Sequence, residues 1–125
     1  MEAIKPLVII TGASSGIGAA TARLFSSKGH ALLLLARRLE NLTALNLPNT
    51  LCKKVDITDF KALQEAVAEA EAKFGPADAI VNNAGMMLLG DIAVQNPEEW
   101  KAMFDVNILG LLNGMQAALP QMKAR

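Results

Sequence analysis

The chain has 125 residues, of which 52% are hydrophobic and 19% charged, and its 12 basic residues balance its 12 acidic ones. This length fits one domain, and a formal net charge of zero argues against binding to nucleic acid or a membrane through bulk charge. One cysteine excludes an internal disulfide, and no apolar stretch is long enough to cross a bilayer. We therefore expect a cytoplasmic α/β protein.

Strands and helices alternate along the predicted chain. Apolar runs predict strands, which cover residues 7–11, 31–36, 50–55 and 78–81. Apolar residues at helical spacing predict helices, which cover residues 17–28, 37–45, 59–74 and 97–125. We expect the last helix to break near residues 105–107. This alternation predicts parallel strands with right-handed crossovers, and hence a doubly wound parallel sheet of the Rossmann type.

A glycine-rich segment, Thr11-Gly12-Ala13-Ser14-Ser15-Gly16-Ile17-Gly18, separates the first predicted strand from the first predicted helix. Gly12 allows a sharp turn, Gly16 lets backbone amides approach a phosphate, and Gly18 allows close packing of helix on strand. The helix N-terminus would then direct its N–H groups at an anion. A plain tight turn is the alternative, but this spacing after a buried strand favours a pyrophosphate site.

The residues after the second strand, Ala36-Arg37-Arg38, indicate which nucleotide is bound. An acid there would bind the adenosine ribose hydroxyls, whereas two guanidinium groups favour the 2′-phosphate of NADP(H) over NAD(H). The alternative is a pair of solvated arginines that open a helix. We favour the phosphate interpretation because the glycine-rich segment precedes it.

Further polar and small residues follow the later strands. Asp56 is suited to accept a hydrogen bond from adenine or to form a turn or helix cap. Asn82-Asn83-Ala84-Gly85 falls at the carboxyl edge of the predicted sheet, where ligands bind in such folds, although an ordinary turn is the alternative. Asn107 lies in an apolar stretch, as a satisfier of a helix kink or part of a polar site. Gly110 and Gly114 permit close helix packing, including at a subunit interface.

Four motifs together resemble those of the short-chain dehydrogenases/reductases: Thr11-Gly12-x-x-x-Gly16-x-Gly18, Asp56, Asn82-Asn83-Ala84-Gly85 and Asn107. The resemblance covers essentially the whole chain, and it is strongest to NADPH-binding members described as blue fluorescent proteins. It implies that the cofactor is held by Gly12, Ser14, Ser15, Gly16, Ile17, Gly18, Arg37, Arg38, Asp56, Ile57, Asn83, Ala84, Gly85 and Val106. Asn107 matches the asparagine that holds a proton-relay water at a helix kink. No metal is implied.

The sequence departs from this family in one respect that bears on activity. The family's proton transfer uses a serine and a Tyr-x-x-x-Lys pair further along the chain, and this sequence contains no tyrosine. The resemblance therefore implies that residues 1–125 are an N-terminal cofactor-binding half, with strand order 3-2-1-4 and an open edge on the fourth strand. We expect the parent enzyme, meaning the longer protein of which this chain would be one half, to form homo-oligomers. We expect it to be an NADP-dependent oxidoreductase that acts on a small carbonyl or alcohol substrate. The chain alone should be inactive.

Two other functions are compatible with parts of the pattern. A non-catalytic NADP(H)-binding module, such as a sensor or a designed half-Rossmann domain, would account for a complete glycine-rich segment without a tyrosine. A methyltransferase has a similar sheet and a glycine loop after its first strand. Ala36-Arg37-Arg38 argues against it, because its cofactor would favour an acid after the second strand.

Overall fold

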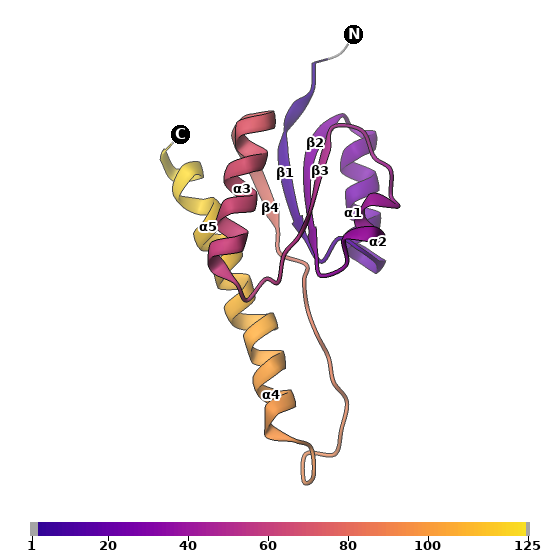
Figure 1. Ribbon diagram of the computed structural model, residues 1–125, viewed down its shortest axis with the longest axis vertical. Coiled ribbons are helices and arrows are strands. Elements are labelled where there is room, and N and C mark those ends of the chain that lie inside the picture. Colours follow the sequence, from indigo (N-terminus) through magenta and orange to yellow (C-terminus); the bar gives the residue numbers. More distant parts are fainter. Residues whose placement is uncertain (1–2, 125) are drawn as a thin grey trace.

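A computed structural model describes residues 3–124 (Figure 1). Its strands are β1 (Lys5–Thr11), β2 (His30–Ala36), β3 (Thr50–Lys54) and β4 (Ala77–Val81). Its helices are α1 (Gly16–Ser27), α2 (Leu39–Thr43), α3 (Phe60–Phe74), α4 (Pro97–Phe104) and α5 (Gly110–Ala124), with a π-helical segment η1 (Asp105–Leu109) between the last two. The alternation of strands and helices follows the predicted order.

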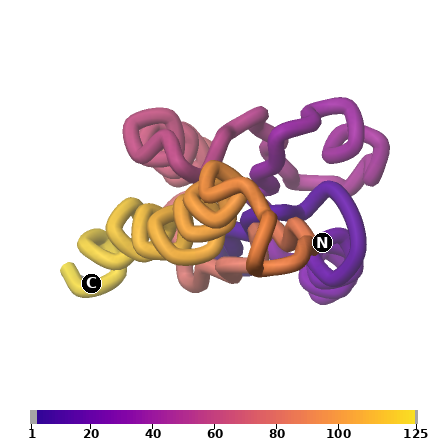
Figure 2. Tube along the Cα trace, turned by 90° about the horizontal axis from the view of Figure 1, so that it is seen from below, coloured from indigo at the N-terminus to yellow at the C-terminus, as the bar shows by residue number. Residues whose placement is uncertain are grey.

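The four strands form one parallel sheet in the order β3-β2-β1-β4, as predicted. Ile9 in the centre of β1 lies between Leu33 of β2 and Ile80 of β4. Helices α3 and α5 cover one face of the sheet, and α1 and α2 cover the other (Figure 1). Figure 2, seen from below, shows the same two helical layers on either side of the strands. The fold is therefore doubly wound.

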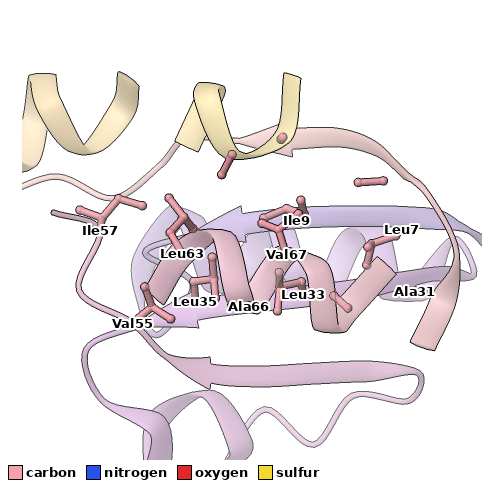
Figure 3. Packing of buried hydrophobic residues seen from close by; sticks show 14 residues of the cluster. Leu7, Ile9, Ala31, Leu33, Leu35, Val55, Ile57, Leu63, Ala66 and Val67 are labelled. Atoms are coloured by element: carbon pink, nitrogen blue, oxygen red, sulfur yellow. The ribbon is translucent and has the colours of Figure 1, made fainter. Parts of the chain in front are cut away.

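The core has two halves because successive side chains of a strand point to opposite faces. One half lies between the sheet and α3 and α5 (Figure 3), and its larger members are Leu7, Ile9, Leu33, Leu35, Leu63 and Val67. The other half lies beneath α1 and α2, and its larger members are Val8, Ile10, Leu32, Leu34 and Leu42. Burial on both faces explains why β1 and β2 are apolar without alternation.

The last helical region runs through α4, η1 and α5 as one long rod whose lower part extends beyond the sheet (Figure 1). The predicted break near residues 105–107 is a π-helical widening over Asp105–Leu109, and the helix continues through it. A Cβ added at Gly110 would lie 2.6 Å from Ile57 Cγ2, and one added at Gly114 would overlap Asn82 Oδ1. The close packing expected of these glycines therefore occurs within the chain.

One predicted helix start is wrong, and one predicted helix end falls on a residue that the structure does not describe. The helix expected from Arg37 begins only at Leu39, because Arg38 has an extended backbone with φ −115° and ψ 100°. Both arginines consequently lie in the turn after β2. The predicted end of the last helix at Arg125 lies outside the described residues. Within residues 3–124, no helix has the length and apolar character needed to cross a membrane.

Candidate functional site

A cavity of about 350 Å³ opens at the carboxyl ends of the strands. Because β1 pairs with β2 on one side and β4 on the other, the connections diverge here, and such a switch point is where open α/β sheets bind ligands. The residues that line it are Thr11, Gly12, Ser14, Ser15, Leu35, Ala36, Arg37, Arg38, Val55, Asp56, Ile57, Asn83, Ala84, Gly85, Met86 and Val106.

The glycine-rich segment forms the floor of this cavity. Gly12 and Gly16 have positive φ angles of 64° and 57°, a conformation that other residues adopt at a cost. A Cβ at Gly12 would lie 2.8 Å from Ala84 Cα, and one at Gly18 would overlap the Gly12 carbonyl oxygen. Apart from the adjoining residues and the backbone of α1 itself, no atom of residues 3–124 lies within 4 Å of a Cβ built at Gly16. Gly12 and Gly18 thus allow close backbone packing, while Gly16 borders open space at the start of α1.

The N-terminus of α1 presents hydrogen-bond donors. Ser15 is the N-cap residue, with φ −160° and ψ 170°, and its side chain makes no capping hydrogen bond. The first-turn N–H groups have no intrahelical acceptor, and the first turn contains no acidic residue. The partial positive charge of the helix end therefore remains available for an anionic group.

The end of β4 is tied to the glycine-rich segment through Thr11. Thr11 is 1% exposed, and its Oγ1 accepts hydrogen bonds from the N–H groups of Asn83 and Ala84, each at 3.0 Å. In return, Asn83 Nδ2 donates to the Gly12 carbonyl oxygen at 3.0 Å. These contacts hold two walls of the cavity in one arrangement.

Asn107 in η1 bonds both backbone groups of Met86. Its Oδ1 accepts from the Met86 N–H at 2.8 Å, and its Nδ2 donates to the Met86 carbonyl oxygen at 2.8 Å. The side chain thus fastens the loop after β4 to the last helix at the π-helical widening. Asn107 is not among the residues that line the cavity, but its partner Met86 is.

Asp56 forms a local turn and also faces an arginine. Its Oδ1 accepts from the Thr58 N–H at 3.0 Å and from Thr58 Oγ1 at 2.7 Å, while its Oδ2 lies 3.9 Å from Arg37 Nη2. The backbone hydrogen bond from Thr58, then its hydroxyl and more weakly the Arg37 charge, lower the pKa of Asp56 below its ordinary 3.8. The helix cap is supplied by Asp59, whose Oδ1 accepts from the Ala62 N–H at 3.1 Å.

The sequence profile of the short chain dehydrogenase family matches residues 6–125. The chain belongs to this family. An uncharacterised oxidoreductase of Listeria monocytogenes is 41% identical in an alignment that covers 95% of this chain and 50% of that protein. The chain spans about half the length of the curated relatives it matches.

Solved structures of short-chain dehydrogenases have the same fold. A closed form of serine dehydrogenase complexed with NADP⁺ has a TM-score of 0.87 at 32% identity, over 93% of this chain and 48% of that one. An alcohol dehydrogenase from the archaeon Thermococcus sibiricus complexed with 5-hydroxy-NADP has a TM-score of 0.88 at 29% identity, over 95% of this chain and 54% of that one. The family is one of oxidoreductases that bind nicotinamide cofactors and act on small molecules.

The short-chain dehydrogenase cavity brings together most of the residues singled out in the sequence. Predicted site residues that line it are Gly12, Ser14, Ser15, Arg37, Arg38, Asp56, Ile57, Asn83, Ala84, Gly85 and Val106. Gly16, Ile17, Gly18 and Asn107 lie outside the lining. Ile17 sits in the first turn of α1 with 78% of its surface exposed.

Five lining residues were not among the predicted site residues, although Thr11 and Ala36 belong to the predicted motifs; they are Thr11, Leu35, Ala36, Val55 and Met86. Most of them end or follow a predicted strand, so the rule that ligands bind at the carboxyl edge of a parallel sheet could have found them. Among residues 3–124, no group of three or more His, Cys, Asp or Glu side chains is placed to hold a metal ion.

Proposed function

We propose that this chain is the cofactor-binding half of an NADP(H)-dependent short-chain dehydrogenase. The observation that carries the proposal is that Arg37 and Arg38 line the same cavity as the glycine-rich segment. Asp56 is the third charged lining residue, so the lining has an excess of positive charge. A 2′-phosphate beside the end of β2 would meet guanidinium groups suited to bind it through paired hydrogen bonds.

Other residues in and beside the cavity are proposed to hold the remainder of NADP(H). The backbone at Gly12 and Gly16 and the N-terminus of α1 would hold the pyrophosphate, together with Ser14 and Ser15. The residues proposed for the adenine side are Asp56 and Ile57, and those for the nicotinamide side are Asn83, Ala84, Gly85 and Val106. The cofactor, when bound, supplies hydride exchange between nicotinamide C4 and a carbonyl or alcohol carbon, while the protein orients it.

Proton transfer in the parent enzyme needs an acid or base in addition to Asn107. Asn107 is proposed to support a proton relay from the helical side of the site, but this sequence has no tyrosine to act as the acid or base. We therefore propose that the 125-residue chain binds NADPH without consuming it in the presence of carbonyl compounds. Turnover by the isolated chain in an absorbance assay would contradict this part of the proposal.

The arginines provide the direct test of cofactor preference. In the double variant Arg37→Ala with Arg38→Ala, the Kd for NADPH should rise by about 10- to 100-fold, the value of lost hydrogen bonds to a charged group. The Kd for NADH should change by less than about threefold, because NADH lacks the 2′-phosphate. Fluorescence titration measures both. Arg23→Ala, which removes an exposed arginine of α1 outside the cavity, is the control. Equal losses for both nucleotides would refute the phosphate assignment.

A non-catalytic NADP(H)-binding module is the second candidate, favoured by a complete glycine-rich segment in a sequence without tyrosine. A Tyr-x-x-x-Lys motif encoded downstream of Arg125 in the source gene would exclude it.

We also propose a cytoplasmic protein that self-associates. Within the described sheet, β4 pairs only with β1, and an open strand edge favours pairing between chains. Size-exclusion chromatography should show a species larger than a 13.3 kDa monomer. A stable monomer would contradict the proposal.

A further inference from the structure

We propose that Asn113 is a positioning residue for the adenosine half of the cofactor site; the inference rests on the proposed nucleotide binding. Asn113 lies in α5, and its Nδ2 donates a hydrogen bond to the Ile57 carbonyl oxygen at 3.0 Å. The two residues are 56 positions apart in the chain, and the bond is partly buried. Asn113 is absent from the cavity lining, so it acts on a ligand through Ile57.

Helix α5 holds Ile57 by its side chain as well as by its backbone. Ile57 is 8% exposed, and its side chain joins the core beneath α3 and α5 (Figure 3). Gly110, one turn before Asn113, allows the helix to approach so closely that an added Cβ would lie 2.6 Å from Ile57 Cγ2. The hydrogen bond and this packing together leave Ile57 little freedom to shift.

The anchored residue, Ile57, lies within the Asp56 turn, between Asp56 and Thr58. Thr58 binds Asp56 Oδ1 through its N–H and its hydroxyl, and the Asp59 N–H donates to the Asp56 carbonyl oxygen at 2.9 Å. These local bonds fix the shape of the turn, and the Val55 N–H, which donates to the Ala36 carbonyl oxygen at 3.0 Å, ties the start of the turn to the end of β2 beside Arg37. The bond from Asn113 adds a second tie, from the α5 side, directly after Asp56. With both sides of Asp56 held, the position of its carboxylate is set.

The variant Asn113→Asp tests this role with little change of shape. It replaces the donor with a carboxylate oxygen beside the Ile57 carbonyl oxygen, which repels it. The Kd values for NADPH, NADH and AMP, measured by calorimetric titration, should each rise by the same factor of roughly 5 to 50. The Kd for nicotinamide mononucleotide, which lacks the adenosine half, should stay unchanged.

Gln116→Glu is the matched control, because it makes the same amide-to-acid change at an exposed position of the same helix. It should leave all four Kd values unaltered. Asn113→Ala removes the donor without adding charge, and because alanine favours helices it serves as the second variant should the aspartate variant not fold. Its Kd values for the three adenosine ligands should rise together by a smaller factor.

Other outcomes would overturn the inference. A lower Tm with unchanged Kd values would mean that Asn113 only stabilises the fold. An altered ratio of NADPH to NADH affinity would place it with the 2′-phosphate contacts, and a weakened nicotinamide mononucleotide would mean a general disturbance of the site. Failure of the proposed function is recognised separately, because the unsubstituted chain would then bind none of the adenosine ligands.

Discussion

The hydroxyl oxygen of Thr11 accepts a hydrogen bond from the backbone N–H of Asn83, 72 residues further along the chain, at 3.0 Å. Asn83 returns the contact, since its side-chain Nδ2 donates to the carbonyl oxygen of Gly12. The loop after β1 and the loop after β4 are therefore a single unit. In the proposed function, this unit sets the distance between the pyrophosphate and nicotinamide sides of the cofactor.

Replacement of Thr11 by valine should destabilise the fold. Thr11→Val keeps the side-chain shape but removes the acceptor of the Ala84 N–H and one acceptor of the Asn83 N–H. The free energy of unfolding should fall by about 1–3 kcal/mol, measured by urea denaturation. Thr21→Val is the control, because Thr21 Oγ1 donates an exposed hydrogen bond to the Ile17 carbonyl oxygen of its own helix, and it should change the value by less than about 0.5 kcal/mol. Equal effects of the two variants would contradict the prediction.

Alanine at Gly18 should also destabilise the protein, although alanine favours helices by about 1 kcal/mol over glycine. The added methyl group would overlap the Gly12 carbonyl oxygen and lie 2.6 Å from Asn83 Nδ2. Overpacking of this kind costs about 1–3 kcal/mol, seen as a lower urea midpoint. Gly90→Ala should have the smaller effect, because the nearest atoms to its methyl group would be those of the flexible Gln95 side chain. A stabilised Gly18→Ala variant would mean that the loop and helix pack less closely than described.

The double hydrogen bond of Asn107 predicts a specific sensitivity to charge. In Asn107→Asp one carboxylate oxygen still accepts from the Met86 N–H, but the other faces the Met86 carbonyl oxygen without a proton to donate. The free energy of unfolding at pH 7 should fall by about 1–3 kcal/mol. Asn41→Asp, at an exposed position of α2, makes the same substitution and should have little effect. An Asn107→Asp variant as stable as the Asn41→Asp control would contradict the role given to Asn107.

Asp56 should make stability depend on pH in the acid range. Its pKa is lowered in the folded state, chiefly by the two hydrogen bonds from Thr58, so ionised Asp56 stabilises the fold. That contribution is complete above the ordinary pKa of 3.8 and is lost as the pH falls through the lower folded value. The urea midpoint of Asp56→Asn should therefore lie below that of the unsubstituted protein at pH 7, and the difference should shrink below pH 3.8.

The hydroxyl of Thr58 provides a second check on this titration. Thr58→Val removes the side-chain hydrogen bond to Asp56 but keeps the backbone one, so the pKa of Asp56 should move up toward 3.8. Carboxyl-carbon chemical shifts measured against pH report this pKa directly. A folded-state pKa at or above 3.8 in the unsubstituted protein would contradict both predictions.

Local pattern predicted the framework of this fold well. The apolar runs of β1 and β2 indicated strands buried on both faces, and the parallel sheet has the expected order. The predicted start of α2 at Arg37 was wrong, because the helix begins at Leu39. Arg38 occupies the N-cap position of α2, but its side chain makes no capping hydrogen bond and arginine is not among the residue types that favour this position. Because α2 is also only five residues long, the sequence contained no boundary signal there. Both arginines lie instead in the turn that lines the cavity.

By itself, the sequence determined the order of the elements, the position of the glycine-rich segment between β1 and α1, and the position of the two arginines after β2. Each of these depends on residues that are near neighbours in the chain. Only the tertiary structure decided which polar groups meet. Asn113 carried no signal, and Asn107 indicated a kink but not its partner Met86. The physical reason is that a buried amide must find a hydrogen-bond partner, and which partner it finds depends on how α5 packs against the sheet.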